Sequence, residues 1–379
     1  MDFKFTAPCH FGLEKTLSYE IKKAGGNELE VTDGRVHFKG SENTMALANI
    51  SCSVAERIGI VLAEFLALSF DDVYDAVKNI RIFDFAKIDD RFPVVKGQSI
   101  NSKLSSIPAL QRTVKKALAE SMSRHYKTVR LSETGDLFPV RFFLIKDKMT
   151  VFLDTSGEGL HKRGYRTNSG EAPIKETLAA GLCDLARVNC DTTMVDPFCG
   201  SGTLLIESAF KALNIPPCLN RQFAAEKWDF FPKRTWSDAR ERLKEKIIRD
   251  SEFKAFGFDK NESMVSLTLE NTKKALFPEF SKLLKAEKRE ISDFKYDISW
   301  KNVKVITNPP YAERLLNQNQ AAKVYGEMGN TLFPRDGHEI YVINSNPEFE
   351  DYLGYKAERN RKLYNGMLMC RFLMYYNRH

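Results

Sequence analysis

The stretch MVDPFCGSGT, residues 194–203, determines the fold expected for this chain. A short apolar strand ends at Asp196, a turn with Gly200 and Gly202 follows, and an apolar helix is expected from Thr203. Strands are expected at 193–196, 255–259, 287–291, 304–308, 339–344 and 366–375, with helices at 172–187, 203–213, 263–276 and 347–354. Strands that alternate with helices in this way predict a parallel, doubly wound α/β sheet with right-handed crossovers.

The first 155 residues show a mixed α+β pattern instead. Strands are expected at 2–6, 34–40, 57–65 and 92–96, helices at 12–24, 41–52, 69–79 and 108–126, and a hairpin at 140–145 and 149–154. On the helix at 108–126, apolar residues recur every four positions and form its core face. The chain therefore divides into an α+β region followed by a larger α/β domain.

The bulk composition is that of a globular protein without a membrane segment. The 379 residues are 43% hydrophobic, which suits two or three domains with ordinary cores. No apolar run approaches the length of a membrane span, and the N-terminus lacks the pattern of a signal peptide. The seven cysteines are scattered without a CxxC pair, which favours the reducing cytoplasm and argues against a metal site. The sequence leaves monomer and homodimer open.

The positive charge of the chain is concentrated in one segment. Residues 96–130 hold eight basic side chains and one acid, so this segment carries the whole net charge of +7. Arg112, Lys115 and Lys116 project from the face of the expected helix that is opposite its apolar face. This distribution favours a nucleic-acid surface, and the alternative is an ordinary solvated helix face.

Three acidic residues follow the ends of successive expected strands, where ligands of open α/β sheets bind. An acid at Asp196 suits the cationic groups of S-adenosylmethionine, whereas a phosphate cradle needs a basic residue and the GxxxxGK[ST] pattern is absent. Asp259 would accept the ribose hydroxyls and Asp293 the adenine amino group; alone, each acid could be a turn or cap residue. The residues expected to bind this cofactor are Asp196, Phe198, Gly200, Gly202, Asp259, Asp293 and Asn308.

Asn308-Pro309-Pro310-Tyr311 follows the strand expected at 304–308 and predicts the acceptor of the methyl group. The side-chain oxygen of Asn308 and the carbonyl of Pro309 are expected to accept the two N–H bonds of an exocyclic amino group. The prolines hold the loop extended, so these acceptors are preorganised. Tyr311 offers a ring on which a flipped base stacks. These four residues are the predicted catalytic group.

A basic stretch, GLHKRGYR at residues 159–166, joins the two expected regions. Its side chains are interpreted as contacts to RNA phosphates that guide the substrate to the active site, and the alternative is an exposed linker. The RNA-binding residues predicted here are His161, Lys162, Arg163, Tyr165 and Arg166.

Four stretches resemble the THUMP-domain RNA guanine-N2 methyltransferases, and most closely the bacterial enzymes that make N2-methylguanosine in large-subunit (23S) ribosomal RNA. They are residues 157–182, DPFCGSGTLLIESA at 196–209, NPPYAERL at 308–315 and KLYNG at 362–366. The resemblance covers the whole chain and is most specific in its C-terminal half. One departure is Ala312, where the family pattern has glycine.

The resemblance implies a ferredoxin-like part at 1–60, a THUMP RNA-binding domain at 61–155, a basic linker at 156–170 and a Rossmann-like, S-adenosylmethionine-dependent methyltransferase domain at 171–379. It implies RNA as the partner, without separating ribosomal RNA from tRNA. Because Asn-Pro-Pro-Tyr serves adenine equally well, a DNA adenine-N6 methyltransferase is a second hypothesis. A non-catalytic RNA-binding factor is a third, although it would have no use for Asp196, Asp259 and Asn308 together.

Overall fold

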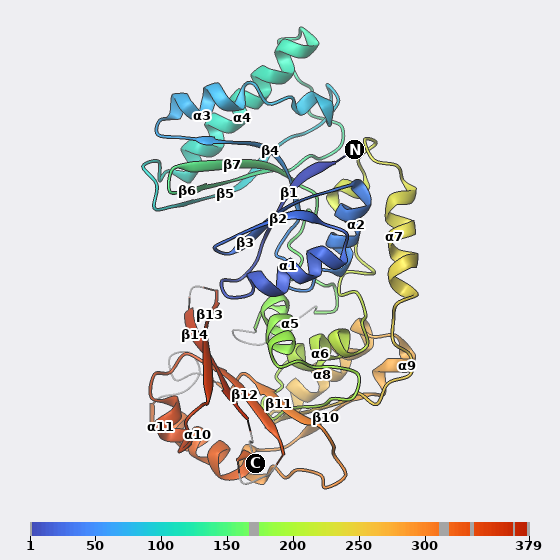
Figure 1. Ribbon diagram of the computed structural model, residues 1–379, viewed down its shortest axis with the longest axis vertical. Coiled ribbons are helices and arrows are strands. Elements are labelled where there is room, and N and C mark those ends of the chain that lie inside the picture. Colours follow the sequence, from blue (N-terminus) through green and yellow to red (C-terminus); the bar gives the residue numbers. More distant parts are fainter. Residues whose placement is uncertain (1, 167–173, 311–317, 334–336, 367, 377–379) are drawn as a thin grey trace.

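The computed structural model describes residues 2–166, 174–310, 318–333, 337–366 and 368–376. Its strands form two seven-stranded sheets, one from each half of the chain. The two sheets and their helices follow one another along the longest axis of the molecule (Figure 1). No helix in the described ranges is both long enough and apolar enough to cross a bilayer.

The N-terminal sheet has the order β2-β3-β1-β4-β7-β6-β5. Its strands are β1 (Phe3–Pro8), β2 (Asn27–Thr32), β3 (Arg35–Gly40), β4 (Gly59–Leu66), β5 (Val94–Ile100), β6 (Val140–Ile145) and β7 (Lys148–Asp154). Neighbours are antiparallel except β5 and β6, which are parallel. The helices are α1 (Glu14–Lys23), α2 (Glu42–Ser51), α3 (Phe70–Val77) and α4 (Ile107–Tyr126), with a short 3-10 turn, η1, at Ile82–Asp84.

Strand β4 joins the two expected parts of this region into one sheet. Ile60 lies opposite Phe5 of β1 on one side and opposite Leu153 of β7 on the other. All three side chains are buried in the same core. Residues 3–66 and 94–154 therefore share a sheet across the boundary expected near residue 60 (Figure 1).

Most expected elements of the N-terminal half are present. Ser41 accepts a hydrogen bond from the backbone N–H of Thr44 and caps α2 as predicted. Strand β2 was not predicted, because nearly all of its side chains are exposed and show no alternation. The strand expected at 92–96 lies instead at Val94–Ile100, beside β6.

The C-terminal sheet has the order β10-β9-β8-β11-β12-β14-β13. Its strands are β8 (Thr193–Asp196), β9 (Lys254–Asp259), β10 (Leu284–Lys288), β11 (Val303–Thr307), β12 (Glu339–Asn344), β13 (Arg359–Asn365) and β14 (Leu368–Tyr375). The first five in this order run parallel, as predicted, and β14 is antiparallel to both of its neighbours. The helices are α5 (Glu176–Leu185), α6 (Thr203–Ala212), α7 (Arg234–Lys244), α8 (Glu262–Ala275), α9 (Pro278–Ser281), α10 (Gln318–Leu332) and α11 (Phe349–Leu353), with short 3-10 turns at Ala224–Glu226 and Ile291–Asp293.

Helices α7, α9 and α10 and strand β13 were not predicted, and β10 is displaced from its expected position; the physical reason is clear for β10 and α7. The strand expected at 287–291 lies at Leu284–Lys288; it is an edge strand, so its exposed side chains give a weak apolar pattern. Helix α7 was not predicted because it is mostly polar, with Thr235, Trp236 and Ala239 as its buried residues.

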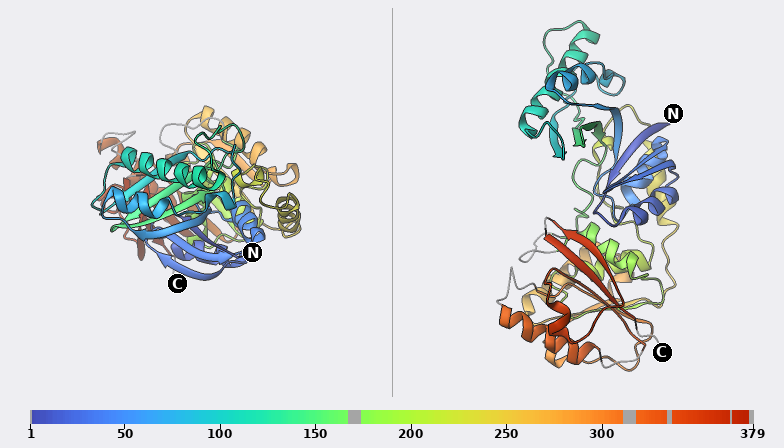
Figure 2. Two further views of the ribbon diagram at one scale, coloured as in Figure 1. Left: turned by 90° about the horizontal axis from the view of Figure 1, so that it is seen from above. Right: turned by 60° about the vertical axis from the view of Figure 1, so that its left-hand side comes forward.

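Part of the C-terminal half packs on the N-terminal sheet. Helix α7 contacts α2, as both views of the ribbon show (Figures 1 and 2). Trp228, in the segment before α7, stacks on Phe138 with 4.5 Å between ring centroids and donates from Nε1 to the carbonyl of Leu137 at 2.8 Å. Phe231 also packs edge-on against Phe3. One apolar core therefore runs from the first sheet into the second.

Candidate active site

The loop between β8 and α6 is shaped by two glycines with positive φ. Gly200 has φ of +53° and Gly202, the N-cap of α6, has φ of +80°. A Cβ atom on Gly202 would lie 2.8 Å from Cγ2 of Thr268, whose hydroxyl donates to the carbonyl of Gly200 at 2.8 Å. Glycine is therefore required both by the backbone conformation and by the close approach of α8.

Asp196, at the end of β8, is buried and anchored by two donors. The hydroxyl of Thr307 donates to Oδ1 at 2.7 Å, and the backbone N–H of Phe198 donates to the same oxygen at 3.1 Å. Burial raises the pKa of Asp196 to about 7, although both hydrogen bonds act in the opposite direction. A cation beside Asp196 would favour its charged form, so this carboxyl suits a positively charged ligand.

Asp259, at the end of β9, is tied to the same loop. Its Oδ2 accepts from the backbone N–H of Gly200 at 3.1 Å, and its Oδ1 accepts from that of Asn261 at 2.9 Å. The side chain is only half-buried, so lone pairs of both oxygens stay available to hydroxyl donors. The structure thus brings Asp196, Asp259 and the glycine loop together at the carboxyl ends of the neighbouring strands β8 and β9.

Asp293 lies on the 3-10 turn after β10 and is exposed. Buried Phe294 packs edge-on against Phe258 of β9, with 5.4 Å between ring centroids, and this contact holds the turn beside the end of β9. Phe198 is half-buried and packs against the same apolar cluster. Asp293 and Phe198 therefore both lie next to the predicted cofactor site.

The segment 308–310 directly follows β11 and is held from its far end. Pro309 is buried, and the carbonyl of Pro310 accepts a hydrogen bond of 3.0 Å from the hydroxyl of Tyr325 on α10. Asn344, at the end of β12, donates from Nδ2 to that hydroxyl at 3.2 Å. Asn308 is half-buried next to Thr307. Tyr311 and Ala312 lie outside the described residues.

Three residues of this site were missed from sequence. Thr307 directly precedes Asn308, so its place at a strand end was the available signal. Tyr325 had no signal, because α10 was not expected. Asn344 ends a strand that was expected, yet nothing near it in sequence links it to Pro310. Within the described ranges, no group of three or more His, Cys, Asp or Glu side chains could hold a metal ion.

The basic stretch at 159–166 is not a phosphate-binding strap in this structure. The side chain of Arg163 is fully buried and pairs with Glu207 at 3.3 Å, while its Nη1 donates to the carbonyl of Leu160 at 2.7 Å. Tyr165 is buried and donates to the same carboxylate at 3.1 Å. Burial raises the pKa of Glu207, and the charge of Arg163 opposes that rise. The prediction that Arg163 and Tyr165 contact RNA is wrong for this conformation, because neither side chain reaches the surface.

The neighbours of these two residues are also mostly engaged within the protein. Arg166 pairs with Glu176 at 2.7 Å, and the side chain of His161 lies 3.5 Å from the carboxylate of Glu56. Lys162 remains exposed and pairs with Glu158. Lys162 is therefore the exposed cation of this stretch.

The basic residues predicted on α4 lie in the N-terminal half, away from the cofactor loop (Figure 1). Arg112 and Lys116 are exposed, and the ammonium of Lys116 lies 5.4 Å from the ring centroid of Tyr74. Lys115 is half-buried, pairs with Glu133 and lies over the ring of Phe92 at 3.9 Å. The structure does not bring these cations next to Asp196, so any role in RNA binding is at a distance from the chemistry.

Comparison with known proteins agrees with both halves of the fold. Residues 163–373 match the family described as "RMKL-like, methyltransferase domain", and residues 4–59 match the "RlmL ferredoxin-like domain". A Bacillus subtilis (strain 168) protein named "Putative RNA methyltransferase YpsC" is 37% identical over 375 residues, which cover 98% of this chain and 95% of the relative.

Two solved structures superpose on the whole chain. One, titled "SMU.472, a putative methyltransferase complexed with SAH", has 34% identity, a TM-score of 0.92 and coverage of 100% of this chain and 99% of the other. The second, titled a "predicted N6-adenine-specific DNA methylase from Listeria monocytogenes str. 4b F2365", has 36% identity, a TM-score of 0.91 and coverage of 100% and 97%. With its Rossmann-like fold and acid-lined glycine loop, the chain belongs to the RMKL-like family of methyltransferases, which use S-adenosylmethionine.

Proposed function

We propose that this enzyme methylates the exocyclic N2 of a guanine in RNA, with large-subunit ribosomal RNA as the favoured substrate. The observation that carries the proposal is the bond from Thr307 to Asp196. The bond joins Asp196, the proposed cofactor acid, to the residue immediately before Asn308, which supports a methyl donor and an amino-binding segment at adjacent strand ends. The relative named "Putative RNA methyltransferase YpsC" supports RNA as the substrate.

The proposed reaction uses few protein groups. S-adenosylmethionine, when bound, supplies an activated methyl group. The side-chain oxygen of Asn308 and the carbonyl of Pro309 accept the two N–H bonds of the amino group and orient its lone pair toward that methyl. Because Tyr325 holds the carbonyl of Pro310, we assign the Pro309 carbonyl as the backbone acceptor. We assign Tyr311 to base stacking.

Bond formation and proton loss balance without a charged base. The new N–C bond forms as the S–C bond breaks, and the sulfonium becomes a neutral thioether. The nitrogen is then cationic and acidic, and it loses one proton to water or to an acceptor of the loop. Asp196 and Asp259 bind the amino acid and ribose ends, and we assign Asp293 to the adenine amino group.

The test is the identity of the methylated nucleoside. The protein is incubated with labelled S-adenosylmethionine and, separately, protein-free large-subunit ribosomal RNA, total tRNA and duplex DNA. N2-methylguanosine in ribosomal RNA supports the proposal, whereas label confined to DNA overturns it.

Two alternatives rest on specific observations. Transfer to adenine N6 of DNA is favoured by the name of the Listeria structure, a "predicted N6-adenine-specific DNA methylase", and because Asn-Pro-Pro can accept the amino group of either adenine or guanine. A tRNA substrate would use the same guanine chemistry. The nucleic-acid arms of the same incubation separate all three.

We further infer that residues 61–155 act as a THUMP RNA-binding domain beside a ferredoxin-like part at 1–60. The exposed Arg112 and Lys116 support this assignment. The methyltransferase domain at 171–379 and the linker at 156–170 then form the catalytic half, with its segment around α7 packed back on the RNA-binding half.

A further inference from the structure

The hairpin of β13 and β14 extends beyond the strand ends that carry the candidate active site. Arg371 of β14 lies opposite Asn344, the last residue of β12, and also opposite Lys362 of β13. The pair nearer the turn, Tyr364 with Met369, therefore lies past the carboxyl end of β12. The hairpin reaches from the C-terminal sheet toward the N-terminal half (Figure 1).

Alternate side chains of the hairpin point to the face of the sheet that α10 and α11 cover. Arg371 shows this direction, because its Nη1 pairs with a carboxylate of α11 at 3.2 Å. Side chains directly opposite one another, or two residues apart along a strand, share a face. Lys362, Tyr364 and Met369 therefore lie on this side too. Tyr325 of α10, which holds the amino-binding segment, packs on the same face.

The hairpin face is close to the amino-binding segment within the sheet. Thr307 of β11 lies opposite Val342 of β12. Asn308 is therefore almost level with Asn344, and so with Lys362 two strands further on. Three strand spacings of about 4.8 Å separate the backbones of Asn308 and Lys362 by about 14 Å. A short stretch of single-stranded RNA spans this distance, so a nucleotide beside a base held at Asn308 reaches the hairpin.

The hairpin face combines positive charge with a flat apolar surface. Lys362 is exposed, and its ammonium lies 5.6 Å from the ring centroid of Tyr364. Such a contact is weak at an exposed site, so the ammonium stays available to a phosphate. Tyr364 is half-buried, and Met369 opposite it is 46% exposed. Single-stranded RNA is bound by aromatic rings set beside basic groups of this kind.

A loop of the N-terminal half holds the hairpin in place. Gly12 approaches β13 so closely that a Cβ on it would lie 3.0 Å from Cδ2 of Leu363, and its carbonyl accepts from Arg361 at 3.0 Å. The carboxylate of Glu14 accepts from the backbone N–H groups of Gly12 and Gly34, at 2.9 Å each, and so fixes the loop. The hairpin is therefore preorganised beside the catalytic edge of the sheet.

The same loop adds a second ring to the surface. Phe11 lies 6.1 Å from Tyr364 between ring centroids, with the two rings at 64°, and it is 48% exposed. Together with Met369 the rings form an apolar patch that Lys362 borders. A contact that only joined the two halves of the protein would bury these side chains, whereas they stay open to solvent. Exposed apolar surface with a polar rim marks an interaction site.

We propose that the β13–β14 hairpin binds the RNA nucleotide next to the methylated base, with Lys362 on its phosphate and Tyr364 against its base. Lys362 and Tyr364 are positioning residues, and they decide which guanine is presented to Asn308. The proposal rests on the proposed RNA substrate. An acidic peptide would use the ammonium but has no need of the rings, so the combination of ring and cation assigns an unpaired nucleotide.

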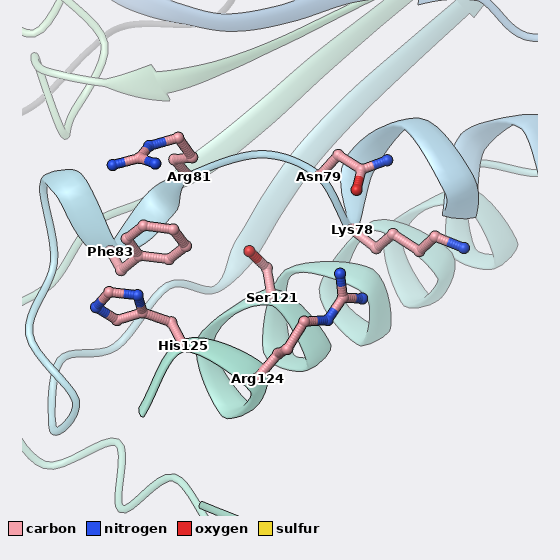
Figure 3. A pocket seen from close by; sticks show the side chains of 7 residues that line it. All are labelled: Lys78, Asn79, Arg81, Phe83, Ser121, Arg124 and His125. Atoms are coloured by element: carbon pink, nitrogen blue, oxygen red, sulfur yellow. The ribbon is translucent and has the colours of Figure 1, made fainter. Parts of the chain in front are cut away.

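The place of the hairpin separates it from the basic side chains at the far end of the molecule. Figure 3 shows Arg81, Phe83 and His125 around a pocket of about 410 Å³ in the N-terminal half. That pocket lies beside α3 and α4, remote from the cofactor loop (Figure 1). A contact there does not orient a base at Asn308, whereas a contact on the hairpin does. The hairpin should therefore act on the rate and position of methylation.

The test is single-turnover methyl transfer to protein-free large-subunit ribosomal RNA at saturating protein, with the methylated positions mapped by mass spectrometry. Lys362→Gln and Tyr364→Leu should each lower the rate about tenfold or more, because the target base is less well oriented toward the methyl group. Both should also spread the methyl group over further guanines. Lys362→Gln should reduce the slope of log affinity against log salt by about 0.7, the value for one phosphate of a single strand.

The controls separate positioning from a structural role. Lys362→Arg keeps the charge and Tyr364→Phe keeps the ring, so both should match wild type in rate and position. Arg249→Ala removes a cation that is 66% exposed and pairs with Glu279, and it should also match wild type. Calorimetry with S-adenosylhomocysteine on every variant confirms that the fold and the cofactor site are intact.

Wild-type rate and position in both Lys362→Gln and Tyr364→Leu overturn the hairpin proposal, even where wild-type protein makes N2-methylguanosine. An equal loss in Tyr364→Phe or Arg249→Ala also overturns it, because the effect is then independent of the ring or of the hairpin. Label that wild-type protein places in DNA alone overturns the proposed function itself, and the RNA nucleotide on the hairpin with it.

Discussion

The hydroxyl of Thr307 donates a 2.7 Å hydrogen bond to the buried carboxyl of Asp196, across the pair of parallel strands β11 and β8. Both residues are last in their strands. The bond therefore joins the acid expected to hold the cationic end of the cofactor to the segment expected to hold the amino group. A shift of either strand end would move both halves of the site.

Thr307→Val should weaken cofactor binding with little change in fold, because valine keeps the shape and removes the donor. A hydrogen bond to a charged group is worth about 1.5–3 kcal/mol, so affinity for S-adenosylhomocysteine should fall roughly 10- to 100-fold. Isothermal calorimetry measures it. Thr6→Val, at another fully buried threonine in β1, is the control and should bind as wild type.

The pKa of Asp196, about 7 in the folded protein against an ordinary 3.8, predicts the pH dependence of stability. Between these values the folded state keeps a proton that the unfolded state has released. The free energy of unfolding should therefore fall as pH rises from about 4 to about 7, by roughly 2–4 kcal/mol. Urea unfolding should show this decline in wild type and its loss in Asp196→Asn. An identical decline in the variant would assign the effect to other groups.

Asn308→Ala should lower methyl transfer by about 100-fold or more, because one of the two acceptors of the amino group is removed. Affinity for S-adenosylhomocysteine should change little. Single-turnover transfer from labelled cofactor measures the first quantity and calorimetry the second. A large loss of cofactor affinity with normal transfer at saturation would move Asn308 from the acceptor side to the cofactor side of the site.

Tyr325→Phe should slow transfer about tenfold, because the Pro310 carbonyl loses the hydroxyl that holds it and the acceptors before it become less ordered. Tyr325 is a positioning residue, so kcat should fall while KM for the cofactor stays constant. Tyr352→Phe, which removes an exposed hydroxyl bonded to Glu348, is the matched control. Equal rates for the two variants would show that Tyr325 only fills the core.

Arg163→Met should destabilise the protein without a specific loss of RNA binding. Removing one partner of a buried ion pair costs about 3–5 kcal/mol, since Glu207 is left without its cation. Urea unfolding measures the cost, and RNA binding is measured at a temperature where the variant is folded. Lys162→Ala should leave stability unchanged. Weak RNA binding by folded Arg163→Met would restore the phosphate-contact interpretation.

Local patterns were read reliably from the sequence where a residue's neighbours along the chain decide its conformation. The strand ending at Asp196, the glycine turn after it and the parallel order of β8 to β12 were predicted, because apolar periodicity and glycine punctuation are local signals. Ser41 as a helix cap is a further case, since a cap depends on the three residues that follow it. The same reliance on local patterns made the interpretation of the basic stretch at 159–166 wrong for Arg163 and Tyr165. Charged and polar side chains are expected to be exposed only when no distant partner, here Glu207, pairs with them in the core.

By itself, the sequence determined the type of fold and the positions of Asp196, Asp259 and Asn308 at or next to strand ends, all through patterns within a few residues. Only the tertiary structure decided that β4 unites the first sheet, that Glu207 buries Arg163, and that Thr307 and Tyr325 hold the two ends of the Asn-Pro-Pro segment. Most of these contacts join residues tens to more than a hundred positions apart. Burial and hydrogen-bond pairing at such distances depend on how the strands and helices pack, which local pattern does not encode.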